Sequence, residues 1–228
     1  MREVVDGVFE VGIGYVHVHL VVTDDGVVLV DTGLPGRSAR IGRALRDLRR
    51  SIGDVTTILL THHHPDHTGG LAEVRRRSGA RVVAHRDDVP YVTGAARAVV
   101  RHPVVRLAGL VMGRPEPAAV DEVVTADGTS PLPGFTALHT PGHTPGHLSY
   151  LLDRAGGVLF AGDAAAGRRG GRIGSTPAMV SADLEEQRRS VTRLAGLDFA
   201  HAVFGHGPAV TGRAVEAFRA YAFAGTAR

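Results

Sequence analysis

The feature that most constrains this chain is the run His62-His63-His64-Pro65-Asp66-His67, which directly follows a short apolar segment at residues 57–60. That segment is too short for a helix and rich in apolar and β-branched residues, so it predicts a buried strand. The run must then leave the end of a strand, where its side chains can converge. Imidazole and carboxylate groups at this density are typical of a zinc site, which needs three or four such ligands. The sequence therefore predicts a metal-binding loop at a strand end.

Three further residues that can bind metal stand after other apolar runs or within a rigid turn. His143 lies in the turn Thr140-Pro141-Gly142-His143-Thr144-Pro145-Gly146, whose prolines and glycines fix the backbone. Asp163 follows the run at 158–160, and His206 follows the run at 202–204. A glycine beside each of them permits close approach. These positions strengthen the prediction of a metal site.

The composition limits the chemistry that this site can perform. Cysteine is absent from the 228 residues, so there is no disulfide, no thiolate nucleophile and no sulfur ligand. A metal must be held by imidazole and carboxylate, which suits zinc, iron or manganese. All 26 basic residues are arginine and the formal net charge is only +3. Because the arginines are scattered along helical stretches, we expect solvated helix faces and no nucleic-acid partner.

The start of the chain, MREVVDGVFEVG, has no apolar core of the signal-peptide kind, and no apolar run reaches transmembrane length. We therefore expect a cytoplasmic protein that has no membrane partner. The length suits one globular domain with a sizeable core.

Strands and helices alternate along the chain after an opening hairpin. Strands at 16–22 and 27–30 are joined by Asp24-Asp25-Gly26, a hairpin signal. Further strands are expected at 57–60, 81–84, 120–125, 136–138, 148–152, 158–160 and 202–204. Helices are expected at 37–50 with Ser38 as a candidate N-cap, at 71–77, at 184–194 after Ser181 and Asp183 as cap candidates, and at 214–222. Residues 86–118 are expected to form a helical lid or insertion. Each half runs from strands through a histidine-bearing loop to a helix, which predicts an α/β fold of two sheets between outer helices.

The order of these motifs resembles the metallo-β-lactamase superfamily. His-x-His-x-Asp-His at 62–67 is followed by Pro-Gly-His-Thr at 141–144, Gly-Asp at 162–163 and Gly-His-Gly at 205–207. Val30-Asp31-Thr32-Gly33 also resembles the early strand and turn of that family. The motifs cover nearly the whole chain and are specific for the superfamily but not for a substrate. The resemblance implies a single domain over residues 1–228 that forms a four-layer αββα sandwich, with two mixed β-sheets flanked by helices.

The resemblance also implies two metal ions, expected to be zinc, with iron or manganese as alternatives. His62, His64 and His143 would bind one ion, Asp66, His67 and His206 the second, and Asp163 would bridge the two. A metal-bound hydroxide would attack the substrate carbonyl. Asp66 would orient that hydroxide or move its proton, and Asp31 would hydrogen-bond a ligand imidazole from behind.

Other polar residues are given lesser roles. His63 is expected to point away from the ligands, and His139 and His147 to support the turn around His143. His17 and His19 share one face of a strand, and a role in lining the site is left open for them. Candidates for binding an anionic substrate are Tyr91, Arg97, Arg101 and His102 in the lid and Arg168 in a glycine-rich basic loop. Exposed helix faces would explain the lid arginines equally well.

Two departures from subfamily patterns narrow the expected reaction. The aspartate at position 163 resembles the glyoxalase II, lactonase and ribonuclease Z side of the superfamily. The chain ends soon after His206, where glyoxalase II continues into a glutathione-binding helical domain, and it has Ala164-Ala165-Ala166-Gly167 where lactonases often place a tyrosine. We therefore expect a dinuclear zinc hydrolase that cleaves an ester, thioester or lactone of a small molecule, anionic molecules included. The alternatives are an iron-dependent persulfide dioxygenase, a β-lactam-hydrolysing enzyme and a catalytically silent binding protein. The sequence does not indicate the oligomeric state.

Overall fold

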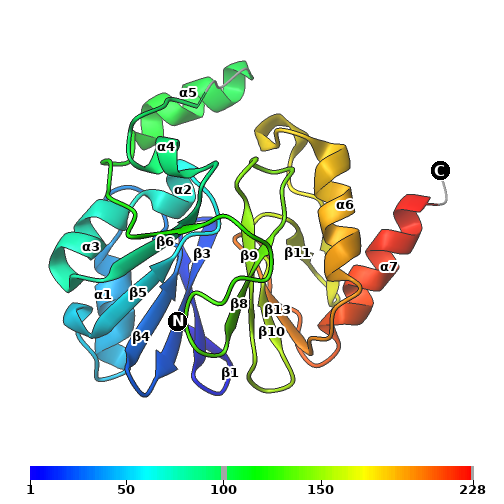
Figure 1. Ribbon diagram of the computed structural model, residues 1–228, viewed down its shortest axis with the longest axis horizontal. Coiled ribbons are helices and arrows are strands. Elements are labelled where there is room, and N and C mark those ends of the chain that lie inside the picture. Colours follow the sequence, from blue (N-terminus) through cyan, green and yellow to red (C-terminus); the bar gives the residue numbers. More distant parts are fainter. Residues whose placement is uncertain (99–101, 227–228) are drawn as a thin grey trace. The chain divides into compact units, whose positions relative to one another are not determined.

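The computed structural model describes residues 1–98 and 102–226. The chain divides into two compact units, Met1–Val123 and Val124–Arg228, and each is described by itself. Each unit contains a β-sheet with helices packed against it (Figure 1). The expected α/β class with two sheets and flanking helices is confirmed, whereas the single domain over residues 1–228 stays a prediction.

A mixed seven-stranded sheet, in the order β1-β2-β3-β4-β5-β6-β7, forms the centre of the first unit. Its strands are β1 (Arg2–Val5), β2 (Val8–Ile13), β3 (Val16–Thr23), β4 (Gly26–Val30), β5 (Val55–Leu59), β6 (Arg81–His85) and β7 (Glu122–Val124). The strands from β1 to β4 pair antiparallel, as the predicted hairpin requires. From β4 through β5 to β6 the pairing is parallel, so these strands deliver their carboxyl ends to one edge.

The helices of the first unit are α1 (Ala39–Asp47), the one-turn α2 (Pro65–Thr68), α3 (Leu71–Ser78), α4 (Val89–Val92) and α5 (Pro103–Met112), with a 3-10 turn η1 (Ile52–Asp54). Figure 1 shows α1 and α3 on the same side of the sheet. Ile41 and Leu45 of α1 and Val74 of α3 are fully buried in one core with the strand residues. Ser38 occupies the predicted N-cap position before α1, but its hydroxyl donates to the Glu73 carboxylate and makes no capping bond.

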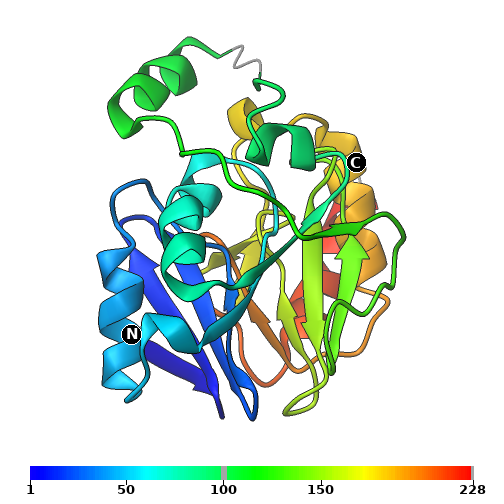
Figure 2. The ribbon, with the colours of Figure 1, turned by 60° about the vertical axis from the view of Figure 1, so that its left-hand side comes forward.

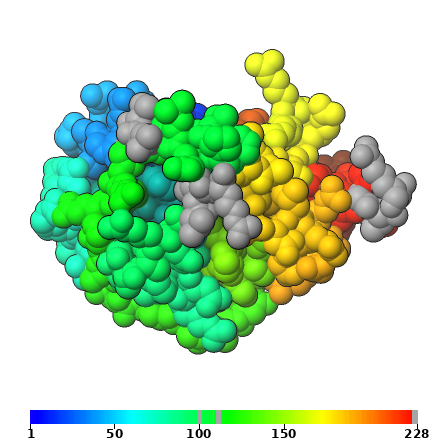
Figure 3. All heavy atoms as spheres, turned by 90° about the horizontal axis from the view of Figure 1, so that it is seen from above, coloured from blue at the N-terminus to red at the C-terminus, as the bar shows by residue number. Residues whose placement is uncertain are grey.

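The second unit is built on a four-stranded sheet in the order β13-β10-β9-β8. Its strands are β8 (Phe135–His139), β9 (Leu148–Leu152), β10 (Val158–Phe160) and β13 (His201–Val203). A separate hairpin is formed by β11 (Ala166–Arg168) and β12 (Arg172–Gly174), followed by a 3-10 turn η2 (Ala178–Val180). The sequence predicted only a basic loop at this hairpin, because three-residue strands around two glycines leave no period to detect. Its tip projects from the surface of the unit as the bright-yellow atoms in Figure 3.

Two helices of the second unit, α6 (Leu184–Leu194) and α7 (Ala214–Thr226), pack side by side (Figure 2). Val191 and Leu194 of α6 and Phe218 of α7 are buried in one core with residues of β10 and β13. The predicted start of α6 is confirmed, since the Asp183 carboxylate accepts from the backbone N–H groups of Glu185 and Glu186 at 2.9 Å each.

Residues 86–118 contain the two short helices α4 and α5, in line with the expected helical insertion. Whether this segment acts as a lid stays a prediction. No helix in the described ranges 1–98 and 102–226 combines the length and apolar character that a membrane crossing requires.

Candidate metal centre

The predicted ligand loop follows β5 in the first unit. The backbone N–H of Leu60 still donates to Val83 O of β6, and the chain then leaves the sheet. His62 and His64 lie in the loop, and α2 begins at Pro65, so that Asp66 and His67 belong to its single turn. The one-turn helix was not predicted from the sequence. It turns the second half of the run back toward the first half.

Four side chains of the run converge on one region of the first unit. Ligand atoms of His62 lie within 4.8 Å of those of His64 and of His67, and the Asp66 carboxylate lies within the same distance of His67. The ring centroids of His62 and His67 are 4.0 Å apart, and those of His62 and His64 are 4.7 Å apart. His62 and His67 are buried, whereas His64 and Asp66 are half-buried. The structure therefore brings together the four ligands that the sequence predicted for this loop.

Asp31, at the end of β4, holds this loop from behind. Its carboxylate accepts from Thr61 N at 2.8 Å, from Thr61 Oγ1 at 2.7 Å and from His67 Nδ1 at 2.8 Å. Asp31 has a φ of 60°, a left-handed conformation that aspartate tolerates better than most residues. It is 2% exposed, so these three donors hold a carboxylate that has little access to water.

These contacts define which imidazole nitrogen of His62 and of His67 is available to a metal. The only hydroxyl proton of Thr61 goes to Asp31, so the 3.0 Å contact between Thr61 Oγ1 and His62 Nδ1 requires His62 Nδ1 to donate. His67 Nδ1 likewise donates to Asp31. In both residues Nε2 is then the nitrogen with a lone pair, which is the form that binds a metal. The predicted role of Asp31 agrees with this arrangement.

His63 belongs to none of the clusters of ligand-type atoms in the described residues, but its ring still meets that of His64 edge-on, with centroids 5.1 Å apart. Its backbone N–H donates to Asp88 Oδ2 at 2.9 Å, and its Nδ1 lies 3.0 Å from the same oxygen. Its ring stacks on Tyr91, with centroids 4.3 Å apart and an interplanar angle of 20°. His63 therefore anchors the loop to α4.

In the second unit, His143 is held in a turn between β8 and β9 that packs on the start of α6. Gly142 has a φ of +127°, and a Cβ built on it would lie 2.2 Å from Gln187 N, so only glycine fits. The backbone N–H groups of Ala182 and Asp183 donate to the carbonyls of His143 and Gly142 at 3.0 and 2.8 Å. The predicted turn is present, with Gly142 at a position where only glycine fits; its rigidity stays a prediction.

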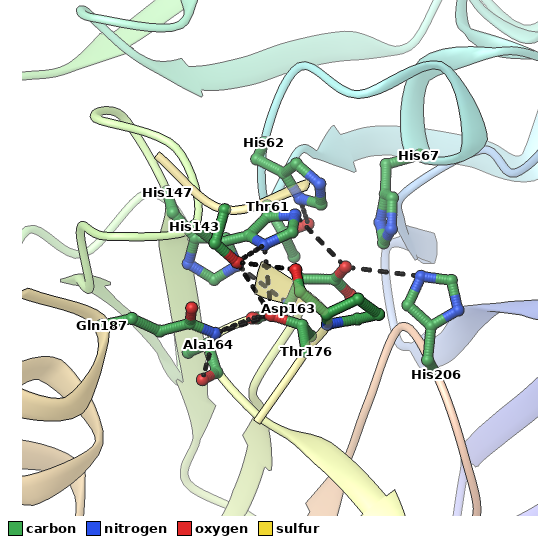
Figure 4. Close-up of polar contacts among 12 residues, drawn as sticks. Thr61, His62, His67, His143, His147, Asp163, Ala164, Thr176, Gln187 and His206 are labelled. Atoms are coloured by element: carbon green, nitrogen blue, oxygen red, sulfur yellow. Dashed lines mark hydrogen bonds and ion pairs between the residues drawn. The ribbon is translucent and has the colours of Figure 1, made fainter. Parts of the chain in front are cut away.

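Asp163 brings two histidines of this unit together. Its Oδ2 lies 3.3 Å from His143 Nε2 and 3.3 Å from His206 Nε2 (Figure 4). Asp163 follows Gly162, which has a φ of 53° and turns the chain sharply after β10. His143 and Asp163 are buried, and His206 is half-buried. Two imidazole groups thus converge on one carboxylate oxygen.

A directed chain of hydrogen bonds fixes the backbone of Asp163. Its N–H donates to His147 Nε2 at 2.9 Å, so His147 is neutral and its Nδ1 donates to Thr140 Oγ1 at 2.8 Å. Thr140 Oγ1 lies 3.0 Å from Ser149 Oγ, which donates to Ala161 O at 3.2 Å. His147 is fully buried. The expected supporting role of His147 agrees with this chain, which supports the Asp163 backbone.

Two further side chains support the same residues, and no pattern in the sequence points to either. Gln187 Nε2 contacts Asp163 O at 2.9 Å, Ala164 O at 3.0 Å and Thr176 Oγ1 at 2.8 Å (Figure 4). Thr176 Oγ1 also lies 3.3 Å from His143 Nδ1. A glutamine on a predicted amphipathic helix has no pattern that distinguishes it from a solvated residue, so only the structure identifies it.

His17 and His19 share one face of β3, as expected, and lie beside Glu10 of β2. Their nearest nitrogens are 3.9 and 4.0 Å from Glu10 Oε2, while Arg2 Nη2 pairs with Glu10 Oε1 at 2.9 Å. Burial, together with the neighbouring charges of His17, His67 and Arg2, lowers the pKa of His19 to about 3. His19 is therefore neutral at neutral pH.

The residues predicted to contact substrate are spread over several elements. Tyr91 stacks on His63, and Arg97 is exposed. His102 immediately precedes α5 and makes no capping bond. Arg168 donates to Ser175 O at 2.8 Å within its own hairpin region. Arg101 lies outside the described residues. Substrate contact by any of these residues stays a prediction.

Both sets of side chains fit a divalent metal by their chemistry. The donors are imidazole nitrogens and carboxylate oxygens, which suit zinc, iron and manganese, and sulfur is absent from them. At least His62 and His67 present the metal-binding tautomer through buried partners. A metal ion would also compensate the charge of the buried Asp163 carboxylate.

Comparison with known proteins agrees with this chemistry. The family model of the metallo-beta-lactamase superfamily matches residues 11–206. A hydroxyacylglutathione hydrolase of Albidiferax ferrireducens is 32% identical over 154 residues, which cover 66% of this chain and 49% of that protein. The probable metallo-hydrolase YflN of Bacillus subtilis is 30% identical over 207 residues, covering 82% of this chain and 77% of that protein. The chain thus spans about half the length of the hydroxyacylglutathione hydrolase.

Solved structures of the same fold are also similar. A metallo-β-lactamase of Cronobacter sakazakii superposes with a TM-score of 0.71 at 25% identity, covering 90% of this chain and 80% of that one. BJP-1, a subclass B3 metallo-β-lactamase of Bradyrhizobium japonicum, gives a TM-score of 0.69 at 25% identity, covering 90% and 76%. Because the family model matches far more than half of the sequence, the chain belongs to the metallo-β-lactamase superfamily of metal-dependent hydrolases.

Proposed function

We propose that this chain is a hydrolase with two zinc ions that cleaves an ester, a thioester or a lactone. The observation that carries the proposal is that all seven ligand-type residues expected from the family pattern fall into two converging sets, one in each unit. Buried partners hold Nδ1 of His62 and of His67, so that Nε2 is left to bind a metal. This arrangement is typical of metal-binding histidines.

The family pattern supplies the proposed division of ligands between the ions. His62, His64 and His143 are proposed for one ion, Asp66, His67 and His206 for the other, and Asp163 for both. When bound, the ions would lower the pKa of water and polarise the substrate carbonyl. Iron or manganese would satisfy the same donors.

The chain's own residues are proposed to handle the proton of the reaction. Water adds to the carbonyl carbon, the bond to the leaving oxygen or sulfur breaks, and the leaving group takes up a proton. Asp66 is the proposed base, since it is half-buried beside His67 and its side chain is still reachable from solvent. Asp31 keeps His67 in one tautomer while the proton moves.

A thioester is the favoured substrate class within this proposal. Hydroxyacylglutathione hydrolases are among the similar proteins, and their name describes a thioester substrate. Tyr91, Arg97, His102 and Arg168 are proposed as candidates for binding an anionic part of the substrate. A β-lactam is the second candidate substrate, because the similar solved structures are metallo-β-lactamases.

The test joins metal quantification to a panel of thioesters, esters, lactones and β-lactams. We expect two zinc ions per chain, hydrolysis of at least one acyl substrate, and loss of that activity after chelation. His62→Ala should remove one ion and reduce kcat/KM by at least a thousandfold, because a missing ligand removes both charge and geometry. His201→Ala is the control, since His201 belongs to neither ligand set and lies at the start of β13.

Three outcomes would overturn the proposal. One iron per chain with oxygen consumption would identify a dioxygenase. Full activity of His62→Ala would place the chemistry elsewhere. Metal binding without turnover of any compound in the panel would favour a binding protein.

A further inference from the structure

A cavity of about 110 Å³ lies within the second unit, between α6, α7 and the segment that follows β12. Leu184, Gln187, Arg188 and Val191 of α6 line one wall. They are spaced as residues i, i+3, i+4 and i+7, so they form one face of that helix. Cavities that hold drug-sized ligands are roughly 300–1,000 Å³, so an occupant of this one must be small.

The walls of the cavity combine one cation with an apolar surface. Arg188 makes no ion pair in the described part of the chain, whereas its neighbour Arg189 pairs with Glu185 at 2.7 Å and with Glu186 at 2.5 Å. Leu184 and Val191 supply apolar surface above and below it on the same helix face. A guanidinium without a carboxylate partner beside apolar side chains suits a small anion that carries a hydrocarbon part.

The polar part of the cavity is connected to two of the predicted metal ligands. Thr176 and Gln187 both line it. Thr176 Oγ1 lies 3.3 Å from His143 Nδ1, and Gln187 Nε2 contacts Asp163 O at 2.9 Å. Thr176 and Gln187 are therefore each in direct contact with a predicted metal ligand (Figure 4). A molecule that displaces either side chain would break its contact with His143 or with the Asp163 carbonyl.

We propose that this cavity binds a short-chain aliphatic monocarboxylate, with its carboxylate on Arg188 and its chain against Leu184 and Val191. Binding would shift Thr176 and so change the environment of the His143 imidazole. The site is separate from the residues proposed for hydrolysis, and its occupancy requires no metal. Because Thr176 would make different contacts with and without the ligand, binding would be coupled to the metal centre through His143.

The binding test uses the metal-free full-length chain, so that no metal ion can hold the carboxylate. Isothermal titration calorimetry with butyrate should give saturable binding, while n-butanol and n-butylamine should bind at least tenfold more weakly. Arg188→Gln should weaken butyrate binding at least tenfold, because a charge-assisted hydrogen bond is lost. Arg189→Gln is the matched control and should bind as the wild type does, since Arg189 does not line the cavity.

Absence of saturable butyrate binding, or equal binding by wild type and Arg188→Gln, would overturn the proposed site. The coupling has its own readout, the NMR signals of the His143 ring. Butyrate should shift these signals in the wild type and leave them unchanged in Thr176→Val. A ring signal that does not respond to bound butyrate would overturn the coupling. Because these measurements need neither metal nor turnover, their failure is distinct from failure of the proposed hydrolase activity.

Discussion

Replacement of Asp31 by asparagine tests how the ligand loop is held. The substitution preserves shape and tolerates the left-handed backbone, but it turns one acceptor oxygen into an NH₂ group. That group must face Thr61 N–H on one side, or Thr61 Oγ1 and His67 Nδ1 on the other. At least one charge-assisted hydrogen bond is lost in either orientation.

The expected magnitude follows from the number of bonds. A hydrogen bond to a charged group contributes about 1.5–3 kcal/mol, so the free energy of unfolding of the metal-free protein should fall by at least about 1.5 kcal/mol. Loss of the partner behind a ligand histidine typically weakens metal binding about 10- to 100-fold. We therefore expect Asp31→Asn to bind zinc at least tenfold more weakly.

The assay is competition for zinc against a chromophoric chelator, with urea unfolding measured in chelator on the same samples. Asp88→Asn is the matched control, because Asp88 is also a buried carboxylate that holds the loop, but through His63. It should bind zinc within about threefold of the wild type, since no ligand imidazole is released. If Asp31→Asn binds zinc as tightly as the wild type does, the inferred tautomer control is refuted.

Three other substitutions test individual features of the fold. Gly142→Ala should lower the free energy of unfolding by more than about 3 kcal/mol, because the new Cβ would lie 2.2 Å from Gln187 N. The control Gly128→Ala, where a Cβ meets no atom, should lower it by only about 1 kcal/mol. Equal losses for the two variants in urea unfolding would contradict the close packing at Gly142. His19 has its pKa lowered from 6.5 to about 3, so the unfolded chain binds its proton first and stability falls as the pH drops below 6.5. Between pH 7 and pH 4 this effect should lower the free energy of unfolding by about 3 kcal/mol. A His19→Gln variant whose stability falls with pH as steeply as that of the wild type would contradict it. His147→Leu should cost about 3 kcal/mol by leaving a buried backbone N–H and a hydroxyl without their partner, and His147→Gln should recover part of this in the same assay.

Several elements follow from local patterns in the sequence. Residues 148–152, 158–160 and 184–194 form two strands and a helix at the predicted bounds, because apolar periodicity and the Asp183 cap act over a few residues. The β11–β12 hairpin and the one-turn α2 were missed. Both are too short to show a period, and both depend on contacts with distant residues.

The sequence by itself indicated which residues are the candidate metal ligands. Four residues that can bind a metal lie within six positions after a strand, so few other roles fit the run at 62–67. His143, Asp163 and His206 each stand beside a glycine, after a strand or in a turn. The tertiary structure alone decided which side chains hydrogen-bond to the predicted ligands and hold them in place. Asp31 reaches His67 across 36 positions and Gln187 reaches Asp163 across 24. Such contacts arise because β4 pairs beside β5 and because α6 packs on the turn at Gly142, and neither pairing leaves a periodic signal in the sequence.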